Sequence, residues 1–299
     1  GLVEVEQNKI YQNVPLRDFN SWRVGGLAEN FLICSDKEKL AELLSAKQIP
    51  QPITFIGLGS NTLFRDGGYH GTIIMLHKGI SEVKQEPPDL IYAEAGLSCS
   101  KLSKFAAKSG YKNCAFFAGI PGTVGGALAM NAGCYGFETW NFVKQVLTID
   151  MDGHQHIRQK GEFEIDYRYV EPKNKKEFFL AAWLEFEKGN KEVSEQEIKS
   201  LLLTRKESQP LNWPSGGSTF RNPENHYAAK LIEECQLKGY QIGGARVSEK
   251  HANFIINTGD ASADDIERLI IHIQSEVYKS KNIHLETEVK IIGNKLNDH

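Results

Sequence analysis

A glycine-rich segment in the first half of the chain has the composition of a ligand-binding loop. Residues 118–127 read Ala-Gly-Ile-Pro-Gly-Thr-Val-Gly-Gly-Ala, and residues 130–133 read Met-Asn-Ala-Gly, with no charged side chain in either stretch. Glycine reaches positive φ angles and lets a ligand approach the backbone closely, and successive N–H groups in such a loop can bind an anion. The segment therefore predicts a site for the phosphates of a nucleotide. The candidate contacts are Ile120, Gly122, Thr123, Gly125 and Gly126.

A second, shorter glycine loop follows the apolar run 53–56. It reads Gly-Leu-Gly-Ser-Asn at 57–61 and offers N–H groups beside two short polar side chains, which also suits a pyrophosphate. The third glycine of a Rossmann fingerprint is missing, and the chain has no P-loop sequence. Taken alone, the loop could instead be a tight turn with Asn61 in the left-handed conformation. The candidate contacts are Gly57, Gly59, Ser60 and Asn61.

Three further polar residues stand where a side chain could face a ligand: Arg168, Ser218 and Glu288. Arg168 lies in Asp-Tyr-Arg-Tyr between apolar segments, and Ser218 lies in Gly-Gly-Ser-Thr, whose glycines would let the hydroxyl meet a ligand at close range. Glu286 and Glu288 share one face of a predicted strand, because side chains alternate with a period of two. That face points either into a site or into solvent, as on an edge strand.

Composition and charge narrow the classes of function. The chain has 299 residues, 40% hydrophobic and 24% charged, with a net charge of −3. This length corresponds to about two domains with a substantial core. A chain without a basic excess is not expected to bind nucleic acid, because such binding depends on neutralising many phosphates.

The remaining chemistry-bearing residues suggest a cytoplasmic protein. Five scattered cysteines without CxxC spacing indicate reduced thiols. They are Cys34, Cys99, Cys114, Cys134 and Cys235. The first residues do not resemble a secretory signal, and no apolar run approaches the ~18 residues of a membrane span. We expect no membrane contact and no obligate protein partner.

His154 and His156 have no further ligand cluster nearby in sequence, so we expect no metal site.

Hydrophobic periodicity predicts alternating strands and helices from about Asn30 onward. Strands are expected at 30–34, 53–56, 72–76, 90–94 and 178–186, with a hairpin of 145–149 and 154–157. Helices are expected around 40–44, around 102–106, from about 194 to 206, around 231 and from 262 past 273. An alternating strand is expected at 284–292.

A polar stretch at 188–191 is the best candidate for a linker. Together with the predicted strands and helices, this stretch indicates an α+β protein with a nucleotide-binding domain at 1–189 and a second, α/β domain at 190–299.

Taken together, these motifs resemble the UDP-N-acetylenolpyruvoylglucosamine reductase (MurB) family from about residue 15 to residue 293. The motifs that carry the resemblance are 57–61, 118–133, 217–223, 238–245, 247–254 and 285–289. The resemblance implies an α+β fold with a two-part FAD-binding domain of the vanillyl-alcohol-oxidase (PCMH) type and a smaller C-terminal α/β substrate-binding domain. It also implies that the glycine loops hold the FAD pyrophosphate. The loop at 57–61 contains no histidine that could tether the flavin, so the FAD is expected to be non-covalent.

The family's chemistry assigns roles to the isolated polar residues. A hydride passes to the terminal carbon of an enolpyruvyl group, and the enolate that develops needs a positive partner. The resemblance gives that role to Arg168, proton donation to Ser218, and polarisation of the substrate carboxylate to Glu288 rather than Glu286. The expected contacts to the substrate carboxylate or diphosphate are Arg205, Asn222 and Lys238.

Two features depart from the family's usual pattern or mark a subgroup. Val170 stands where a serine is common, which removes a hydroxyl beside Arg168. The short run between Phe220 and Leu231 resembles the compact form of the family, which lacks an inserted loop that covers the substrate.

The function implied is the NADPH-driven reduction of UDP-N-acetylglucosamine enolpyruvate to UDP-N-acetylmuramate in peptidoglycan precursor synthesis, with NADPH and substrate taking turns in one site. The alternatives are an FAD oxidase of the same superfamily and a nucleotide-binding protein without catalysis.

Overall fold

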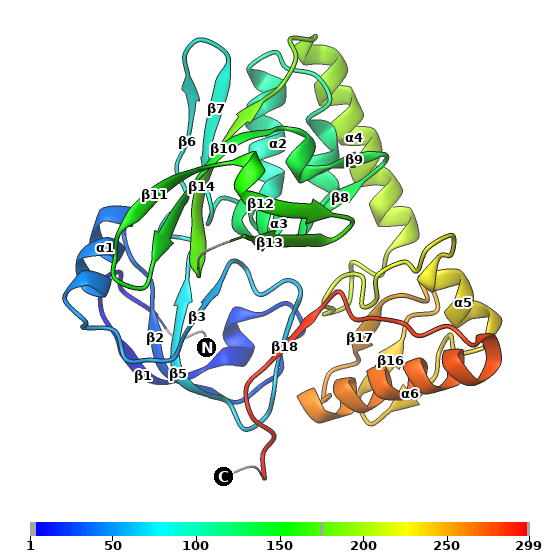
Figure 1. Cartoon of the computed structure of the whole chain (residues 1–299). Coiled ribbons are helices and arrows are strands. Elements are labelled where there is room, and N and C mark those ends of the chain that lie inside the picture. The colour runs from blue at the N-terminus through cyan, green and yellow to red at the C-terminus, as the bar shows by residue number, and fades with distance from the viewer. Residues whose placement is uncertain (1–3, 174–175, 298–299) are drawn as a thin grey trace.

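The N-terminal part of the chain contains two sheets that lie one above the other in Figure 1. The computed structural model describes residues 4–173 and 176–297. The lower sheet has the order β1-β2-β5-β3, and only β1 runs antiparallel to its neighbour. Its strands are β1 (Tyr11–Pro15), β2 (Leu27–Leu32), β3 (Ile53–Ile56) and β5 (Tyr69–Met75), and helix α1 is Lys37–Ser45. Residues 71–75 of β5 are buried without alternation, as expected of a strand covered on both faces.

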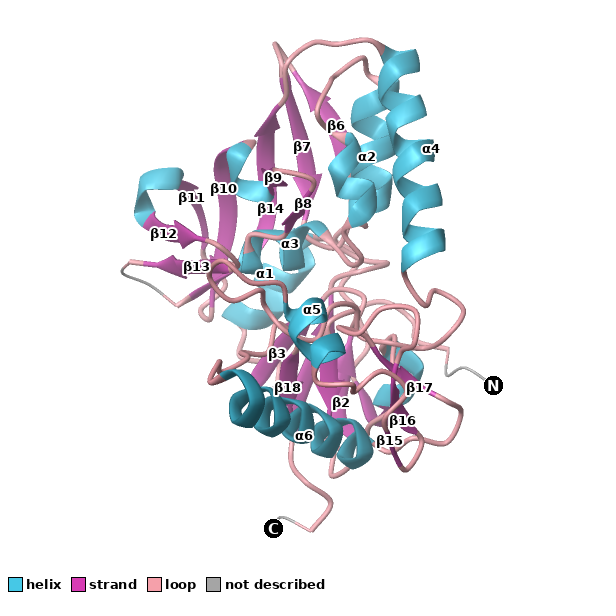
Figure 2. Cartoon of the chain, turned by 90° about the vertical axis from the view of Figure 1, so that its right-hand side faces the viewer, coloured by secondary structure: helices cyan, strands magenta, loops and turns pink. Residues whose placement is uncertain are grey.

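The second sheet is antiparallel and has the order β11-β10-β14-β7-β6. Its strands are β6 (Val83–Glu86), β7 (Leu90–Glu94), β10 (Val143–Asp150), β11 (Gln155–Gln159) and β14 (Glu177–Glu185). Three helices share one hydrophobic core with this sheet: α2 (Cys99–Lys108), α3 (Val124–Met130) and α4 (Lys191–Ser208). The glycine segment at 118–133 is built around α3, so it lies between this core and the rest of the molecule (Figure 2).

Short elements complete this part of the chain. Two hairpins are formed by β8 (Gly133–Cys134) with β9 (Phe137–Glu138), and by β12 (Phe163–Asp166) with β13 (Tyr169–Pro172). The 3₁₀ helices are η1 (Leu16–Phe19), η2 (Ala115–Gly119), η3 (Thr139–Asn141) and η4 (Lys160–Glu162).

The C-terminal part packs two helices on a small antiparallel sheet (Figure 1). The sheet has the order β15-β16-β17, formed by Gln241–Ile242, Ala245–Val247 and Ile255–Asn257, and the helices are α5 (Ala228–Glu234) and α6 (Ala263–Lys281). Ile266, Leu269, Ile270 and Ile273 of α6 are buried, as their spacing predicts.

Several contacts fix the C-terminal part against the N-terminal part. Strand β18 (Lys290–Ile292) pairs in parallel with β4 (Thr62–Phe64). The Asp66 carboxylate accepts hydrogen bonds from the N–H groups of Ala263 and Asp264 at the start of α6. The fully buried Trp22 donates its indole N–H to the Ile255 carbonyl at 2.8 Å. The relative position of the two parts is therefore set by specific hydrogen bonds as well as by apolar packing.

The predicted closing strand at 284–292 is wrong in extent, because only Lys290–Ile292 forms a strand. Before it, the N–H groups of Glu288 and Val289 both donate to the Thr219 carbonyl, at 2.8 and 3.4 Å. Two N–H groups that share one carbonyl acceptor interrupt the regular hydrogen-bond pattern of paired strands.

The predicted start of the helix near Ser194 is also wrong. Helix α4 begins at Lys191, because the Asn190 side chain accepts a hydrogen bond from Val193 N and caps the helix. By contrast, the strands expected at 53–56 and 90–94 are confirmed at those bounds.

The division into domains at residue 189 stays a prediction. Helix α4, which that division assigns to the C-terminal part, places Ile198 in the core of the N-terminal part. Its Ser194 hydroxyl donates to the Tyr111 carbonyl at 2.6 Å. Among residues 4–173 and 176–297, no helix combines the length and the apolar character that crossing a bilayer requires.

Candidate active site

One cleft of about 220 Å³ brings together both glycine loops and the three isolated polar residues. Gly57–Asn61 and Gly119–Thr123 form part of its wall, and Arg168, Ser218 and Glu288 line it as well. These residues come from both parts of the fold. The cleft therefore depends on how the C-terminal part sits against the N-terminal part.

The two glycine loops face each other too closely for side chains. A Cβ on Gly57 would overlap the Thr123 side chain, and a Cβ on Gly122, whose φ is +107°, would lie 2.6 Å from the Ser60 hydroxyl oxygen. Glycine is required at Gly122 for its backbone angle as well as for the space. The closeness leaves backbone exposed along the wall of the cleft.

Several amides in these loops are free to bind an anion. Within the described part of the chain, the N–H groups of Gly59, Ser60, Gly122 and Thr123 donate no hydrogen bond. Such a group of N–H donors, next to the N-terminus of α3, favours a phosphate. The loops therefore fit the pyrophosphate of a dinucleotide.

Gly125, one of the predicted contacts, has a different local role. Its N–H donates to the Ala95 carbonyl at 2.8 Å, and a Cβ there would lie 2.9 Å from the Ala95 Cβ. It is not among the residues that line the cleft, whereas Ile120, Gly122, Thr123 and Gly126 are. Gly125 thus allows α3 to pack closely against the segment that follows β7.

A larger cavity of about 1090 Å³ adjoins the cleft. The two share Leu58, Ser60, Pro121, Gln209, Gly217 and Phe254 in their walls. Small-molecule sites have volumes of roughly 300–1,000 Å³. The connected space is therefore large enough for an extended dinucleotide whose pyrophosphate lies at the glycine loops.

Arg168 is presented to the cleft by the turn of the β12–β13 hairpin. Its φ is +51°, a left-handed conformation that costs about 1 kcal/mol or more for a residue with a side chain. Its Nε donates to Glu288 Oε1 at 3.0 Å, and Nη1 and Nη2 donate to the carbonyls of Asn131 and Gly133 at 3.1 and 2.8 Å. These charge-assisted hydrogen bonds offset the strain and fix the guanidinium.

The Val170 departure does not leave Arg168 without support. Val170 pairs with Ile165 in the hairpin and packs against the core of the N-terminal part. The guanidinium is held by backbone carbonyls and a carboxylate instead of a neighbouring hydroxyl.

Glu288 is the buried member of the acidic pair. Its side chain is 15% exposed, and burial raises the pKa of its carboxyl above the usual range, although the nearby Arg168 opposes this. The Glu286 side chain is 66% exposed and pairs with Arg221 at 3.2 Å. The two carboxylates therefore have different surroundings, although the sequence pattern alone put them on one face.

Ser218 lies at the junction between the cleft and the C-terminal part. It follows Gly217, whose φ of +73° turns the chain, and it lines the cleft. No hydrogen bond occupies its hydroxyl within the described residues. The hydroxyl is therefore free to donate to a ligand.

The structure does not bring the three predicted substrate contacts together. Arg205 lines the larger cavity, where its Nη1 donates to the Ala118 carbonyl at 3.0 Å and burial lowers its pKa. Asn222 lies in a separate cavity beside Tyr167 and Arg221, of about 1060 Å³. Lys238 is not among the lining residues of these three cavities and pairs with Glu233 at 3.2 Å.

Residues that position Arg168 were missed at the sequence level. The Tyr167 ring lies 4.8 Å from the Arg168 guanidinium carbon, and the Tyr167 carbonyl accepts a hydrogen bond from Arg221. Asn131 belongs to the glycine-rich segment and adopts a left-handed conformation (φ 48°) at the end of α3. Asparagine is one of the residues that commonly end a helix in this conformation, so its residue type was a local signal for it. Tyr167 and Arg221 carry no local signal of this kind.

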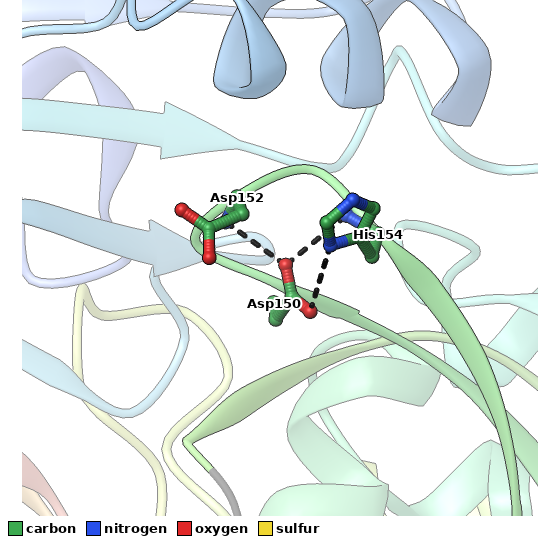
Figure 3. A group of neighbouring side chains, drawn as sticks. All are labelled: Asp150, Asp152 and His154. Atoms are coloured by element: carbon green, nitrogen blue, oxygen red, sulfur yellow. Dashed lines mark hydrogen bonds and ion pairs between the residues drawn. The ribbon is translucent and has the colours of Figure 1, made fainter.

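The described residues contain one group that resembles a metal site, Asp150, Asp152 and His154, at the turn of the β10–β11 hairpin (Figure 3). Asp150 Oδ1 accepts the N–H groups of Asp152 and His154, and Asp152 Oδ1 pairs with Lys47 at 2.6 Å. The group is thus already used for the turn and an ion pair.

Comparisons with known proteins find relatives that cover nearly the whole chain. The domain described as UDP-N-acetylenolpyruvoylglucosamine reductase, C-terminal domain, matches residues 209–292, and an FAD binding domain matches residues 28–157. The UDP-N-acetylenolpyruvoylglucosamine reductase of Nitrosomonas eutropha is 47% identical over 297 residues, 96% of this chain and 90% of that protein. The protein of the same name from Legionella pneumophila (strain Corby) is 46% identical over 292 residues, 97% of this chain and 94% of that protein.

A solved structure supports the same assignment. The UDP-N-acetylenolpyruvylglucosamine reductase (MurB) of Thermus caldophilus superimposes with a TM-score of 0.80 at 28% identity, covering 95% of this chain and 98% of that chain. The predicted fold class, an FAD-binding part followed by a C-terminal substrate-binding part, is confirmed. On these identities and coverages, the chain belongs to the UDP-N-acetylenolpyruvoylglucosamine reductase (MurB) family.

Proposed function

We propose that this chain reduces the enolpyruvyl ether of UDP-N-acetylglucosamine to UDP-N-acetylmuramate, with FAD as a non-covalent cofactor and NADPH as the reductant. The reaction belongs to peptidoglycan precursor synthesis. Membership of the family supports the reaction class. The observation that carries the residue roles is the meeting of Arg168, Ser218 and Glu288 in one cleft beside both glycine loops.

The residues of the cleft fit FAD. The free N–H groups at Gly59, Ser60, Gly122 and Thr123 would hold its pyrophosphate, and the adjoining cavity has room for the rest of a dinucleotide. When bound, FAD supplies the hydride that it receives from NADPH. Arg205, which lines the larger cavity, adds a positive charge on that side.

Arg168 stabilises the negative charge that develops when the enolpyruvyl group accepts a hydride at its terminal carbon. The charge moves toward the substrate carboxylate as an enolate, and a fixed guanidinium requires no reorganisation to meet it. Its three protein acceptors hold it in place before substrate arrives. Such preorganised charges contribute more at a largely buried site than in bulk water, and this side chain is only 15% exposed.

Ser218 donates the proton that completes the reduction. The proton goes from its Oγ to the carbon next to the substrate carboxylate, and the ether is left saturated. A hydroxyl is a weak acid, so the transfer is favourable only as the enolate develops.

Glu288 Oε1 accepts from Arg168 Nε, which leaves Oε2 available to the substrate. Because burial raises the pKa of this carboxyl, the neutral acid persists to higher pH than for an ordinary glutamate. A neutral acid can donate a hydrogen bond to the substrate carboxylate, which polarises it. Arg205, Asn222 and Lys238 are proposed as contacts to the substrate carboxylate or diphosphate.

The two alternative functions do not explain why these residues lie together. An FAD oxidase acting on another substrate, or a binding protein without catalysis, would not require Ser218 and Glu288 beside Arg168 at the cofactor loops.

The test is anaerobic mixing of NADPH-reduced protein with UDP-N-acetylglucosamine enolpyruvate, followed by flavin absorbance. The proposal expects oxidised flavin to return in step with UDP-N-acetylmuramate formation. Protein purified without bound flavin and unable to take it up would favour the binding protein. Reoxidation by molecular oxygen but not by the enolpyruvyl substrate would favour the oxidase.

Replacing Gly57 by alanine is expected to reduce FAD binding, because the added methyl group meets Thr123 across the cleft. The matched control is Gly161→Ala, since a Cβ at Gly161 meets nothing within 4 Å. FAD affinity is measured by titrating the stripped protein and following flavin fluorescence. A Gly57→Ala protein that binds FAD as tightly as Gly161→Ala would show that the loops do not contact the cofactor.

The variant Ser218→Ala is expected to separate the two half-reactions. Bleaching of FAD by NADPH should stay within about twofold of wild type, while reoxidation by the enolpyruvyl substrate should slow by about 10²–10⁴-fold, the range for loss of a general acid. Stopped-flow absorbance measures both. An equal loss of rate in both half-reactions would contradict the assignment of Ser218 as the proton donor.

Glu288 is expected to set a pH limit on reoxidation. The protonated form is the active one, so the rate should fall as pH rises through the raised pKa of Glu288. Glu288→Gln, which donates a hydrogen bond at every pH, should lose this fall in rate with pH and should react more slowly. Glu286→Gln should keep the pH profile of the wild type. A wild-type rate that increases through the same range, or a larger loss in Glu286→Gln, would contradict the assignment.

A further inference from the structure

We propose that Glu138 is a positioning residue for Arg168, acting as the second counter-ion that holds the guanidinium in place while Glu288 interacts with substrate. The inference rests on the proposed function, because it concerns the same reaction. It assigns a role to a residue that does not itself line the cleft.

The geometry puts Glu138 beside the guanidinium on a side away from Glu288. Glu138 Oε2 lies 3.7 Å from Arg168 Nη1, whereas Glu288 Oε1 lies 3.0 Å from Nε. The Glu138 side chain is 37% exposed and the Glu288 side chain 15%. Arg168 is therefore flanked by one buried and one more exposed carboxylate, at different nitrogens.

A buried asparagine fixes the Glu138 carboxylate. Asn131 Nδ2 donates to Glu138 Oε2 at 3.0 Å and to the Asp166 carbonyl at 3.0 Å, while Asn131 Oδ1 accepts from Trp140 N at 3.1 Å. The Asn131 carbonyl in turn accepts from Arg168 Nη1. The same asparagine thus ties the end of α3, the start of the β12–β13 turn and Glu138 into one network around Arg168.

The positive charge of Arg168 needs a negative partner that Glu288 alone cannot provide when it is protonated. If both carboxylates were charged beside one guanidinium, the group would carry a net negative charge and would oppose an enolate. With a proton on Glu288, which its burial favours, Glu138 is the remaining negative partner of Arg168. The ion pair with Glu138 then persists while the protonated Oε2 of Glu288 donates a hydrogen bond to the substrate.

A charge at this distance also leaves Arg168 its catalytic effect. At 37% exposure the Glu138 carboxylate is screened by solvent, so it neutralises the guanidinium less than a fully buried partner would. Its main contribution is orientation. Misplacing a catalytic group by about 1 Å can cost on the order of 10²-fold in rate.

The test is Glu138→Gln, which preserves size and the hydrogen bond from Asn131 but removes the charge. Glu162→Gln is the matched control: Glu162 Oε1 lies 3.3 Å from Arg158 Nη1, its side chain is 46% exposed, and Arg158 also pairs with the buried Glu177. That arrangement repeats the one at Arg168 but is formed by residues that line neither the cleft nor the larger cavity.

Glu138→Gln is expected to slow substrate-driven reoxidation by about tenfold to a hundredfold. NADPH-driven bleaching, the dissociation constant of the enolpyruvyl substrate by calorimetry and the thermal midpoint should each stay close to those of Glu162→Gln. Glu138→Asp, which keeps the charge, should recover part of the reoxidation rate.

Reoxidation as fast in Glu138→Gln as in Glu162→Gln would overturn the proposal. Equal slowing of both half-reactions with a lowered thermal midpoint in both Glu138 variants would overturn it too, since that pattern indicates a structural role. Failure of the wild-type protein to be reoxidised by the enolpyruvyl substrate would instead refute the proposed function, so the two failures are distinguishable.

Discussion

The fixed position of one guanidinium, that of Arg168, is the constraint on which the rest of the site depends. A charged group at 15% exposure loses much of its hydration and must recover it from hydrogen bonds within the protein. Here the acceptors are a carboxylate from the C-terminal part and two carbonyls from the segment that ends α3. The left-handed turn residue adds a local cost that these bonds offset. The result is a charge held ready before any substrate binds.

This arrangement requires the two parts of the chain to stay in register. Glu288 comes two residues before β18, and β18 pairs with β4, which follows the loop at 57–61. A shift of β18 along β4 would therefore move Glu288 relative to both the glycine loop at 57–61 and Arg168. The Arg65 and Glu267 side chains form a bidentate pair at 3.0 and 2.8 Å beside this joint, and the Arg65 neighbour Asp66 caps α6. The geometry of the cleft and the packing of the two parts thus depend on the same contacts.

Sequence patterns predicted the parts of this structure that are encoded locally. Glycine runs mark places where backbone must approach backbone or ligand, and Gly57 and Gly122 stand there for that reason. Apolar periodicity predicted strands such as Ile53–Ile56 and the buried side of α6, because each depends on its own residues. The roles of Arg168, Ser218 and Glu288 came from the family resemblance, and their meeting in one cleft was visible only in the folded chain.

Features that arise from contacts between distant residues could not be predicted. The irregular segment before β18 depends on the Thr219 carbonyl, which is almost 70 residues away and accepts two donors. The Asn131 and Glu138 network likewise joins three segments of the chain, and an isolated glutamate gives no sign of it. Arg205, Asn222 and Lys238 have the right charge or polarity in sequence, yet the fold places them in different surroundings.

We propose that the Arg168 guanidinium accelerates the reduction of substrate and has no part in the reduction of the cofactor. Anaerobic stopped-flow absorbance on Arg168→Lys tests it most directly, because lysine keeps a charge but loses the planar set of donors that Glu288, Asn131 and Gly133 hold. Reoxidation by UDP-N-acetylglucosamine enolpyruvate is expected to fall by about 10²–10³-fold, the scale of losing one preorganised charge donor, while NADPH should bleach the flavin at the wild-type rate. Reoxidation at the wild-type rate, or an equal loss in both half-reactions, would contradict it.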